Sequence, residues 1–576
     1  MNSTMAFITV LLGILAATVL LGIRQRSRDA ATLETALREQ YGHRPVRPVP
    51  ADRLQRLRAL SEEYRSQEYD ASGDLREIDE ITWNDLEADR LFADLDTCRS
   101  DAGEWFLYRL LRKPALSGAQ QAFAEEDIAV WEERPELRLE VQKALSRAGH
   151  DGTFDAVQAE RMLLEGGEIS LPAQIAALAL PFAALAVMCV HTQAGLLMLL
   201  AVLAYNIVSY FRARSAIGEP LGMIQTMLRL AAAADRIPDL RGTPHEAGRA
   251  AMAASAGKIS GTLRGSRLLL REAGDPLRAP LDYLCMLLHP DLIVYALIRK
   301  QAGGLVEETR ALYRETGRLD ASIAVASWRR TLSVWCEPVL TEEPAAERGA
   351  AAAEQPVYAV KGLIHPLLEA PVGNDLETSR PILVTGSNAS GKSTFLKAAA
   401  YAALLAQTVR TVPASEYAAP PLRVCTSMAL RDSLQEGESY YIVEIRSLKR
   451  ILDAAEAGSG QPRILCCIDE VLRGTGTVER IAASSEILLE LARRGVLCMA
   501  ATHDGELTSL LDGTYDNYHF GEQFDGGDVR FTYRIEKGPS RSQNAIRLLG
   551  ELSYDRGIVE RARKRADTFL KEGIWR

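Results

Sequence analysis

A glycine-rich stretch in the second half of the chain carries the residue types that bind phosphate. The apolar run Ile382–Val384 leads into Gly386-Ser-Asn-Ala-Ser-Gly-Lys-Ser-Thr394, and strong helix formers continue from Phe395. A strand, a G-x-x-x-x-G-K-S loop and a helix in this order are typical of a P-loop. The N–H groups of such a loop curl around a phosphate, and the helix N-terminus adds partial positive charge. The stretch predicts a nucleotide site, and a chance glycine loop before a helix is the less favoured alternative.

Residues of this loop have separate predicted roles. Lys392 is expected to reach the β- and γ-phosphates, and the Ser393 hydroxyl is expected to hold Mg²⁺. The predicted nucleotide-binding residues of the loop are Gly386, Ser387, Asn388, Ala389, Ser390, Gly391, Lys392, Ser393 and Thr394.

Polar side chains also end two later apolar runs. Asp469 and Glu470 end the first run, and His503 ends the second. Asp469 suits the water shell of Mg²⁺ opposite Ser393. Glu470 can polarise a water for attack on the γ-phosphate, and His503 is expected to contact that phosphate or that water. Lys392, Glu470 and His503 are therefore the predicted catalytic residues, with simple strand termination and a surface histidine as the alternatives.

One further segment gains a role only if two copies share the site. Asp432–Glu444 contains the turn Gly437-Glu-Ser439 directly before helix-forming residues. A second helix N-terminus is redundant within one chain, because the P-loop already holds the phosphates. It becomes useful if it reaches the γ-phosphate of a partner, as in ABC-type ATPases. We therefore predict a homodimer that binds ATP and Mg²⁺, with Ser439 completing the site of the partner.

The composition is that of a folded protein in a reducing compartment. Of the 576 residues, 47% are apolar and 25% are charged. The net charge of −9 provides no basic field over the whole chain that would favour nucleic acid. The eight cysteines are scattered and form no C-x-x-C motif, so neither a disulfide framework nor a zinc site is predicted.

Two apolar blocks are long enough to cross a membrane. Met5–Ile23 contains no charged residue, and neither does Leu171–Phe211, which His191-Thr-Gln193 interrupts as the turn of a hairpin. Arginines follow both blocks, which places the cytoplasm on that side. We predict three spans in the cytoplasmic membrane with the ATPase facing the cytoplasm. A cleavable signal peptide and a buried hairpin in a soluble core are the alternatives.

The rest of the upstream sequence has a helical pattern. Amphipathic stretches run from Glu77 to about Leu164 and from Leu221 to Pro338. The second stretch contains a run with seven basic side chains and two acidic ones. A solvated helix face is the default interpretation, and contact with phosphate on DNA or lipid head groups is the alternative. The candidate DNA contacts are Arg236, Arg241, Arg249, Lys258, Arg264, Arg267 and Arg271.

These motifs resemble the MutS family in order and spacing. The resemblance rests on Gly386–Thr394, Asp432–Glu444, Asp469-Glu470 with Arg473-Gly-Thr475, and Ala501-Thr-His503. Ile364-His-Pro366 and Asn374-Asp375 look like the entry to the family's ATPase domain, so the resemblance adds Asn374 to the nucleotide site. Gly538–Leu549 resembles the segment before the family's dimerising helices. Residues 356–570 therefore look like a MutS ATPase domain.

Upstream the resemblance is weaker. Asp96–Pro114 resembles the start of the MutS core helical domain, and Leu319–Ser327 resembles its lever helix. No room exists before residue 80 for the family's mismatch-reading domain and connector. Phe123-Ala-Glu125 copies the mismatch-wedging triplet but lies inside the helical core region, so we interpret it as coincidence. We expect a membrane-anchored MutS relative without the mismatch-recognition domain.

The predicted fold is an α/β P-loop ATPase domain of the ABC type at the C-terminus, after an all-α core and lever domain and three transmembrane helices. The predicted parts are an N-terminal anchor at 1–28, a linker and helical core at 29–170, a transmembrane hairpin at 171–211, a helical lever at 212–345, and the ATPase domain with dimerisation helices at 346–576.

Two functions fit these predictions. The first is a membrane-associated MutS-like ATPase coupled to DNA binding, in mismatch repair or a related DNA transaction. The second is an ATP-driven switch on membrane or protein partners, which the spans, the acidic net charge and the missing mismatch domain favour. An ABC transporter subunit fits less well, because three spans are too few for a pathway and Gly437-Glu-Ser439 looks like the MutS type.

Overall fold

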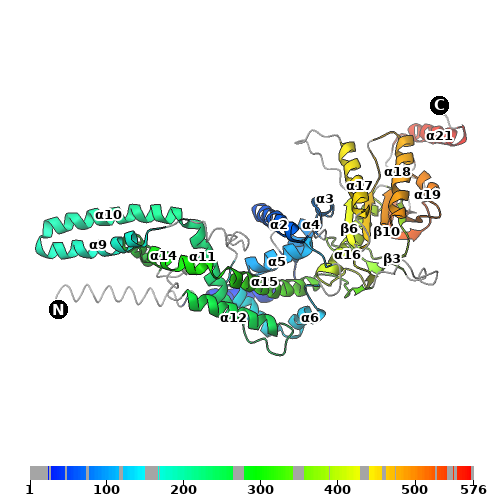
Figure 1. Cartoon of the computed structure of the whole chain (residues 1–576). Coiled ribbons are helices and arrows are strands. Elements are labelled where there is room, and N and C mark those ends of the chain that lie inside the picture. The colour runs from blue at the N-terminus through cyan, green and yellow to red at the C-terminus, as the bar shows by residue number, and fades with distance from the viewer. Residues whose placement is uncertain are drawn as a thin grey trace. The chain divides into compact units, whose positions relative to one another are not determined.

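The computed structural model divides the chain into two compact units, which we describe separately (Figure 1). The first unit comprises Met1–Ser72, Leu95–Tyr108 and Glu126–Trp328, and the second comprises Gly73–Asp94, Arg109–Glu125 and Arg329–Arg576. The structure describes residues 24, 28–45, 49–72, 77–115, 121–149, 167, 169–263, 278–341, 356–387, 389–428, 440–456, 462–473, 475–525, 528–540, 546, 549 and 554–572. The division differs from the predicted domains, because residues 73–94 and 109–125 group with the P-loop rather than with the helical core.

Helices are the regular secondary structure of the first unit among its described residues. Its helices are α2 (Ala51–Ser72), α5 (Asp101–Arg112), α6 (Glu125–Glu133), α7 (Pro135–Leu145), α9 (Leu171–Val190), α10 (Thr192–Ala216), α11 (Gly218–Ala234), α12 (Glu246–Thr262), α13 (Arg278–Leu288), α14 (Pro290–Gly303) and α15 (Val306–Arg329).

Helix α15 lies in the core of the first unit and binds its neighbours through buried polar groups. Asp320 is 1% exposed, and its carboxylate accepts hydrogen bonds from the N–H groups of Arg99 and Ser100 at 2.8–3.1 Å. The Trp131 indole donates to Ser322 at 2.8 Å. Since an unpaired buried carboxylate is costly, these contacts fix α15 against the start of α5.

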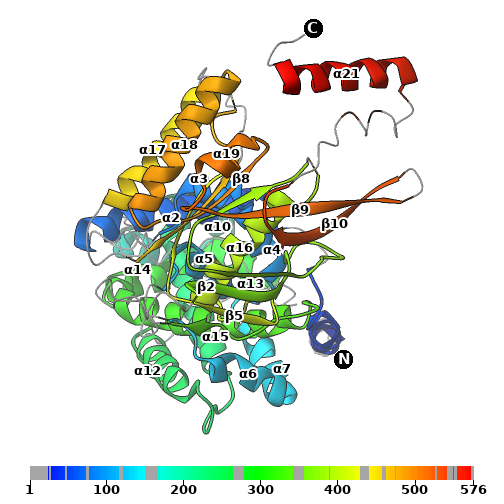
Figure 2. The same ribbon diagram turned by 90° about the vertical axis from the view of Figure 1, so that its right-hand side faces the viewer.

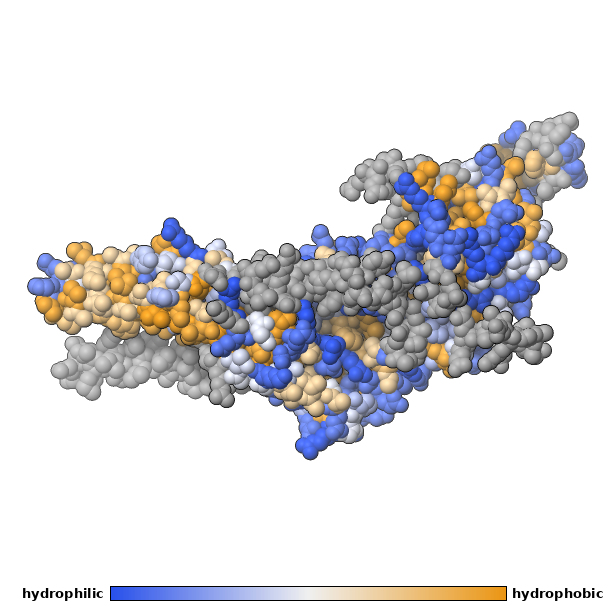
Figure 3. Space-filling model, in the orientation of Figure 1, coloured by the Kyte–Doolittle hydropathy of each residue, from blue (hydrophilic) through white to orange (hydrophobic). Residues whose placement is uncertain are grey.

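Helices α9 and α10 form an apolar hairpin joined at His191. Both are long and apolar enough to cross a membrane, with only 22% and 17% of the tested residues buried. Apolar residues gather along this hairpin in Figure 3. The described residues therefore contain two candidate spans, or three if the bent pair α13 and α14 counts as one. The predicted span Met5–Ile23 lies outside the described residues.

The second unit contains two sheets. The six-stranded sheet has the order β10-β9-β4-β8-β7-β6, and the four-stranded sheet has the order β1-β5-β2-β3. The strands are β1 (Val339–Leu340), β2 (Tyr358–Leu363), β3 (Asn374–Thr378), β4 (Ile382–Thr385), β5 (Glu416–Ala419), β6 (Arg423–Ser427), β7 (Ile464–Asp469), β8 (Leu497–Thr502), β9 (Asp516–Asp525) and β10 (Asp528–Lys537). The helices are α3 (Glu80–Asp85), α4 (Ala88–Leu95), α16 (Lys392–Thr408), α17 (Tyr440–Glu456), α18 (Thr477–Arg493), α19 (Glu506–Leu510) and α21 (Arg556–Glu572).

Helices cover both faces of the six-stranded sheet. Residues of α17, α18 and α19 share one apolar core with β4, β6, β7 and β8 (Figure 2). Helix α16 is buried along most of its length and also contacts β2 of the smaller sheet, where Tyr358 donates to the Ala399 carbonyl at 3.0 Å. Parallel strands buried on both faces explain the continuous apolar runs in the sequence.

A short upstream segment is built into this α/β unit. Helix α3 packs on β6, and Asp85 at its end is 3% exposed. The Asp85 carboxylate accepts hydrogen bonds from the Thr426 hydroxyl and the Met428 N–H, both at 2.8 Å. Glu87 pairs with Lys397 of α16 at 2.8 Å. Residues far apart in sequence thus fix the carboxyl end of β6.

We expect Asp85→Ala to loosen the end of β6. A buried donor on Thr426 and a half-buried donor on Met428 would lose their acceptor, so the local opening free energy should fall by about 2–3 kcal/mol. Hydrogen exchange of the β6 peptide in the full chain measures this directly. Asp453→Ala is the control, because Asp453 is exposed and pairs with Lys449 one helical turn away; its effect should stay below about 0.5 kcal/mol. Unchanged β6 protection in Asp85→Ala would contradict the assignment.

Candidate functional site

Strand order brings the predicted site residues to one edge of the six-stranded sheet. β4, β8 and β7 are adjacent and parallel, with Thr385 beside Thr502 and Asp469 beside Ala501. Their carboxyl ends therefore lie together, and the P-loop, Glu470 and His503 follow directly. Ligands of open α/β sheets bind at such carboxyl ends.

The P-loop backbone has the conformation that its glycines permit. Gly386 and Gly391 have φ values of 148° and 110°, and a Cβ at Gly391 would lie 3.3 Å from the Tyr533 ring. Helix α16 begins at Lys392, so its N-terminus faces the loop. The hydroxyl oxygens of Ser387 and Ser390 are buried and have no hydrogen-bond partner among the described residues. These unpaired hydroxyls suit a ligand with several acceptor oxygens.

Lys392 is held inside the loop that precedes it. Its Nζ donates to the carbonyl oxygens of Gly386 and Ser387, each at 2.8 Å. The side chain is 5% exposed, and this burial lowers the pKa of Lys392. A cation desolvated in this way gains from any anion that enters the loop.

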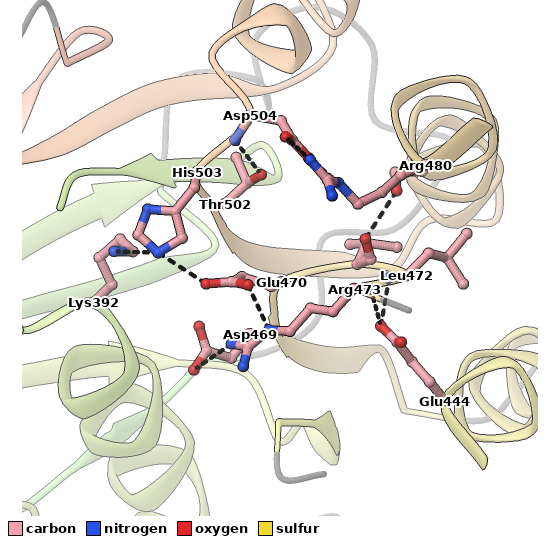
Figure 4. Close-up of polar contacts among 12 residues, drawn as sticks. Lys392, Glu444, Asp469, Glu470, Leu472, Arg473, Arg480, Thr502, His503 and Asp504 are labelled. Carbon is pink, nitrogen blue, oxygen red and sulfur yellow. Dashed lines mark hydrogen bonds and ion pairs between the residues drawn. The ribbon is translucent and has the colours of Figure 1, made fainter. Parts of the chain in front are cut away.

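Glu470 lies at the centre of a charged cluster (Figure 4). Its carboxylate is 2.8 Å from His503 Nε2 and 2.5 Å from Arg473 Nε. The hydrogen bond with His503 is the main cause that lowers the pKa of Glu470, and burial opposes it. Lys392 Nζ also lies 3.5 Å from His503 Nε2. Because one ring nitrogen cannot donate to Glu470 and accept from Lys392 together, the shorter contact assigns the proton of Nε2.

The backbone after β7 has a strained conformation that determines where the Glu470 side chain points. Glu470 has a φ of 59° and Leu472 a φ of 58°, in the left-handed region that non-glycine residues rarely occupy. The Glu470 N–H donates to the Ala501 carbonyl at 2.9 Å, which extends the β7–β8 pairing by one residue. The turn after β7 therefore presents Glu470 toward β8, where His503 follows.

A cavity of about 620 Å³ opens beside this cluster. Its lining includes Asp469, Ser393 and the P-loop residues from Ala389 to Thr394. Asn374 also lines the cavity, but its side chain is occupied: Nδ2 donates to the carbonyls of Val372 and Tyr533 at 3.2 and 3.0 Å, and Oδ1 accepts from the Ile535 N–H at 2.8 Å. Asn374 thus joins β3 to β10, and its predicted nucleotide contact stays a prediction.

The lining also bears on the predicted metal site. Among the described residues, no group of three or more His, Cys, Asp or Glu side chains could hold a metal ion. Mg²⁺ needs few protein ligands, because it keeps several waters and binds nucleotide phosphates. Ser393 and Asp469 on the same cavity are compatible with that mode.

Sequence reasoning assigned no role to two side chains that support the cluster. Arg473 pairs with Glu470 and lies 3.9 Å from Asp469. Glu444 of α17 is 5% exposed and accepts hydrogen bonds from the N–H groups of Leu472 and Arg473. Burial raises the pKa of Glu444. A glutamate in the first turns of an amphipathic helix is unremarkable in sequence, so only the fold reveals this contact.

Several predicted residues remain apart from the cavity or outside the description. Asn388, Ser439, Arg264, Arg267 and Arg271 lie outside the described residues. Phe123 is 1% exposed and Glu125 binds Arg329 at 2.5 and 2.8 Å, so neither is available as a wedge.

The basic run of the first unit is partly neutralised where it is described. Arg241 pairs with Asp239 at 2.6 Å, and Lys258 pairs with Glu308 at 3.0 Å. Arg249 donates to the carbonyl of Ile237 at 3.0 Å. Most of the described members therefore have local partners, as expected for a solvated helical face.

Comparison with known proteins gives the same assignment for the second unit. The family model described as MutS domain V matches residues 382–570. The DNA mismatch repair protein MutS of Thermus thermophilus is 34% identical over 204 residues, which are 34% of this chain and 24% of that protein. The corresponding protein of Thermotoga neapolitana is 36% identical over 211 residues, covering 35% and 26% of the two chains.

A third relative is the DNA mismatch repair protein MutS 2 of Haloarcula marismortui, 35% identical over 186 residues that make up 31% of this chain and 19% of that protein. The chain thus spans about a fifth to a quarter of the length of the curated relatives it matches. The matched region holds the P-loop, Asp469, Glu470 and His503 on one sheet edge. Residues 382–570 of this chain are therefore similar to domain V of the MutS family.

Proposed function

We propose that the chain is a membrane-associated ATPase of the MutS type. The observation that carries this proposal is the convergence of Lys392, Asp469, Glu470 and His503 on one cavity that also contains the P-loop. MutS domain V is a P-loop ATPase-type domain, so the family match supports the same activity. The proposed substrates are ATP and water, and the products are ADP and phosphate.

The residues of the site have separate proposed roles in hydrolysis. The P-loop N–H groups, the Ser387 and Ser390 hydroxyls and Lys392 would bind the phosphates. Ser393 and Asp469 would hold Mg²⁺, which when bound supplies charge neutralisation at the phosphate oxygens. Glu470 orients and polarises the attacking water, and His503 keeps Glu470 ionised by donating from Nε2.

Arg473 restrains Glu470 until the site is complete. A carboxylate bound by both Arg473 and His503 has fewer lone pairs left for a water. We infer that the Arg473 contact opens during the catalytic cycle. The loop that carries Arg473 is tied to Glu444 of α17, and α17 directly follows the segment with Ser439. Ser439 from a second copy is the proposed trigger, which makes the active unit a homodimer.

In the first version of this proposal, ATP hydrolysis is coupled to the binding of DNA. The matched relatives carry the name DNA mismatch repair protein, and Arg236 is an exposed basic residue without an ion pair among the described residues. In the second version, the ATPase switches a membrane or protein partner without mismatch recognition. The local ion pairs of Arg241 and Lys258 favour this second version. In both versions, the apolar hairpin anchors the chain in the cytoplasmic membrane with the ATPase on the cytoplasmic side.

Two variants separate ATP binding from hydrolysis. Lys392→Ala should weaken ATP binding at least tenfold, because the buried cation that faces the phosphates is lost. Glu470→Gln should retain ATP binding but reduce kcat by about 10²-fold or more, and it should accumulate an ATP-bound dimer. Nucleotide binding, phosphate release and particle size are measured on the full-length protein in detergent. Glu490→Gln on α18 is the control, because Glu490 pairs with Arg493 and Arg494 and does not line the cavity. Normal hydrolysis by Glu470→Gln would refute the water-activating role.

The His503 contact predicts a shift in pH dependence. Donation from His503 lowers the pKa of Glu470, so loss of this donor should raise that pKa toward the ordinary carboxylate range. In His503→Ala the acid limb of the kcat–pH profile should therefore move to higher pH, whatever the height of the plateau. His519→Ala provides the control, because His519 bonds the Gly538 carbonyl instead. An unshifted limb would contradict the role of His503.

DNA binding by the full-length protein distinguishes the two versions. Fluorescence anisotropy with homoduplex, mismatched and branched DNA should show binding that weakens steeply as salt rises. Arg236→Ala should weaken binding more than Arg241→Ala, because Asp239 already pairs with Arg241. No binding at low salt would eliminate DNA as the ligand and leave the partner switch.

A further inference from the structure

Helices α13 and α14 are attached to the apolar hairpin by buried polar side chains. His289, between the two helices, is 0% exposed and has a φ of 56°. Its Nδ1 lies 2.7 Å from Gln174 Oε1 on α9, and its Nε2 lies 2.9 Å from the Asn206 carbonyl on α10. One residue thus bonds both helices of the hairpin.

Neighbouring contacts continue this attachment. Asn206 Nδ2 donates to the carbonyls of Ala177 on α9 and Leu287 on α13, at 2.8 and 2.6 Å. Asp291 of α14 is 1% exposed, accepts from the Tyr210 hydroxyl at 2.9 Å and lies 3.6 Å from Arg214. Polar groups away from water stay buried only when they are paired. The four helices are therefore one packed body, not a hairpin with a loose neighbour.

The contacts of the flanking helices favour a re-entrant path over a third crossing by this pair. Helix α12 precedes α13, and helix α15 follows α14. Lys258 of α12 pairs with Glu308 of α15 at 3.0 Å, and Thr316 of α15 donates to Met252 of α12 at 3.6 Å. Since α12 and α15 are in contact, these two helices lie on the same side of any bilayer, and a re-entrant pair between them needs no further crossing. The two helices are bent by 74° at His289, which suits a re-entrant pair.

The contacts of His289 with the hairpin indicate how deep α13 and α14 lie in the membrane. Asn206 marks the level of His289, and α10 extends from Thr192 to that level, which is roughly 20 Å of helix. The hydrocarbon core is about 30 Å thick. A hairpin whose tip at His191 reaches the far side therefore places His289 inside the hydrocarbon, near the side where the hairpin enters.

At this depth, several apolar side chains of α13 and α14 are exposed. Tyr283 and Leu284 of α13 are 65% and 45% exposed, and Leu297 of α14 is 55% exposed. On the hairpin, Val208 and Phe211 are 53% and 56% exposed near the same level. No described element covers these side chains. Lipid acyl chains are the partner that suits uncharged, partly aromatic surface continuous with a membrane hairpin.

We propose that α13 and α14 form a re-entrant, membrane-embedded helix pair that contacts acyl chains through Tyr283, Leu284 and Leu297. The inference rests on the membrane association proposed above. It assigns a second lipid-contacting element to a segment between α12 and α15, and it keeps these two helices on one side of the membrane.

Spin-label accessibility in lipid nanodiscs tests this proposal on the full-length chain. The background carries Cys189→Ala and Cys336→Ala, because these are the described cysteines that are not buried. Labels at Tyr283→Cys and Leu297→Cys should collide with oxygen several-fold more than with a water-soluble nickel complex. Leu197→Cys on α10, where Leu197 is 70% exposed, gives the lipid reference. Lys258→Cys on α12 gives the water reference, because the Lys258 side chain is 66% exposed.

Each pattern of results has one meaning. Lipid-like values at 283, 297 and 197 support the re-entrant pair. Water-like values at 283 and 297 with a lipid-like value at 197 overturn the pair and leave the hairpin anchored. Labels at 283 and 297 that are shielded from both reagents overturn it as well, because a protein surface would then cover them. A water-like value at 197 refutes the membrane association itself.

Discussion

The site depends on one constraint: the charged side chains at the carboxyl ends of β4, β8 and β7 must neutralise one another. Lys392 is buried and Glu470 is half-buried, so each charge would be costly there without a partner, whereas Arg473 is exposed. Their opposite signs and short contacts make the cluster tolerable before any ligand binds. A bound nucleotide changes this balance, because it brings new negative charge to Lys392. The groups that neutralise one another in this cluster are therefore also those that would respond to a ligand.

The contact between Asp85 and Met428 shows how the edge is connected to the upstream sequence. Met428 directly precedes the residues that lead to Ser439, and Glu444 beyond them binds the loop of Arg473. Both ends of this stretch are thus anchored by buried carboxylates of the same α/β unit. In the homodimer proposed above, these two carboxylates would link a second protomer to Glu470.

The sequence predicted the P-loop unit well because its information is local. Apolar runs ending in Gly386, Asp469 and His503 identify strand ends, and parallel strand ends meet at one edge. Arg473 and Glu444 were missed because their roles depend on contacts across the fold. The place of Asp85 in this unit was also missed, since helical periodicity does not reveal which core a helix joins. The hairpin was predicted from composition alone, whereas the packing of α13 against it was not.

The contacts of Asn206 and His289 explain why amino-acid composition did not predict that α13 packs against the hairpin. A polar residue in an apolar helix is read as an interruption, but here Asn206 Nδ2 bonds α9 and α13, and the two ring nitrogens of His289 bond α9 and α10. Such bonds fix which surfaces meet, whereas apolar contacts tolerate many arrangements. The same principle holds at Glu470, whose partners come from different strands and loops. At both sites, buried polar pairs determine which elements pack together. Such a pair cannot be recognised from one sequence segment alone.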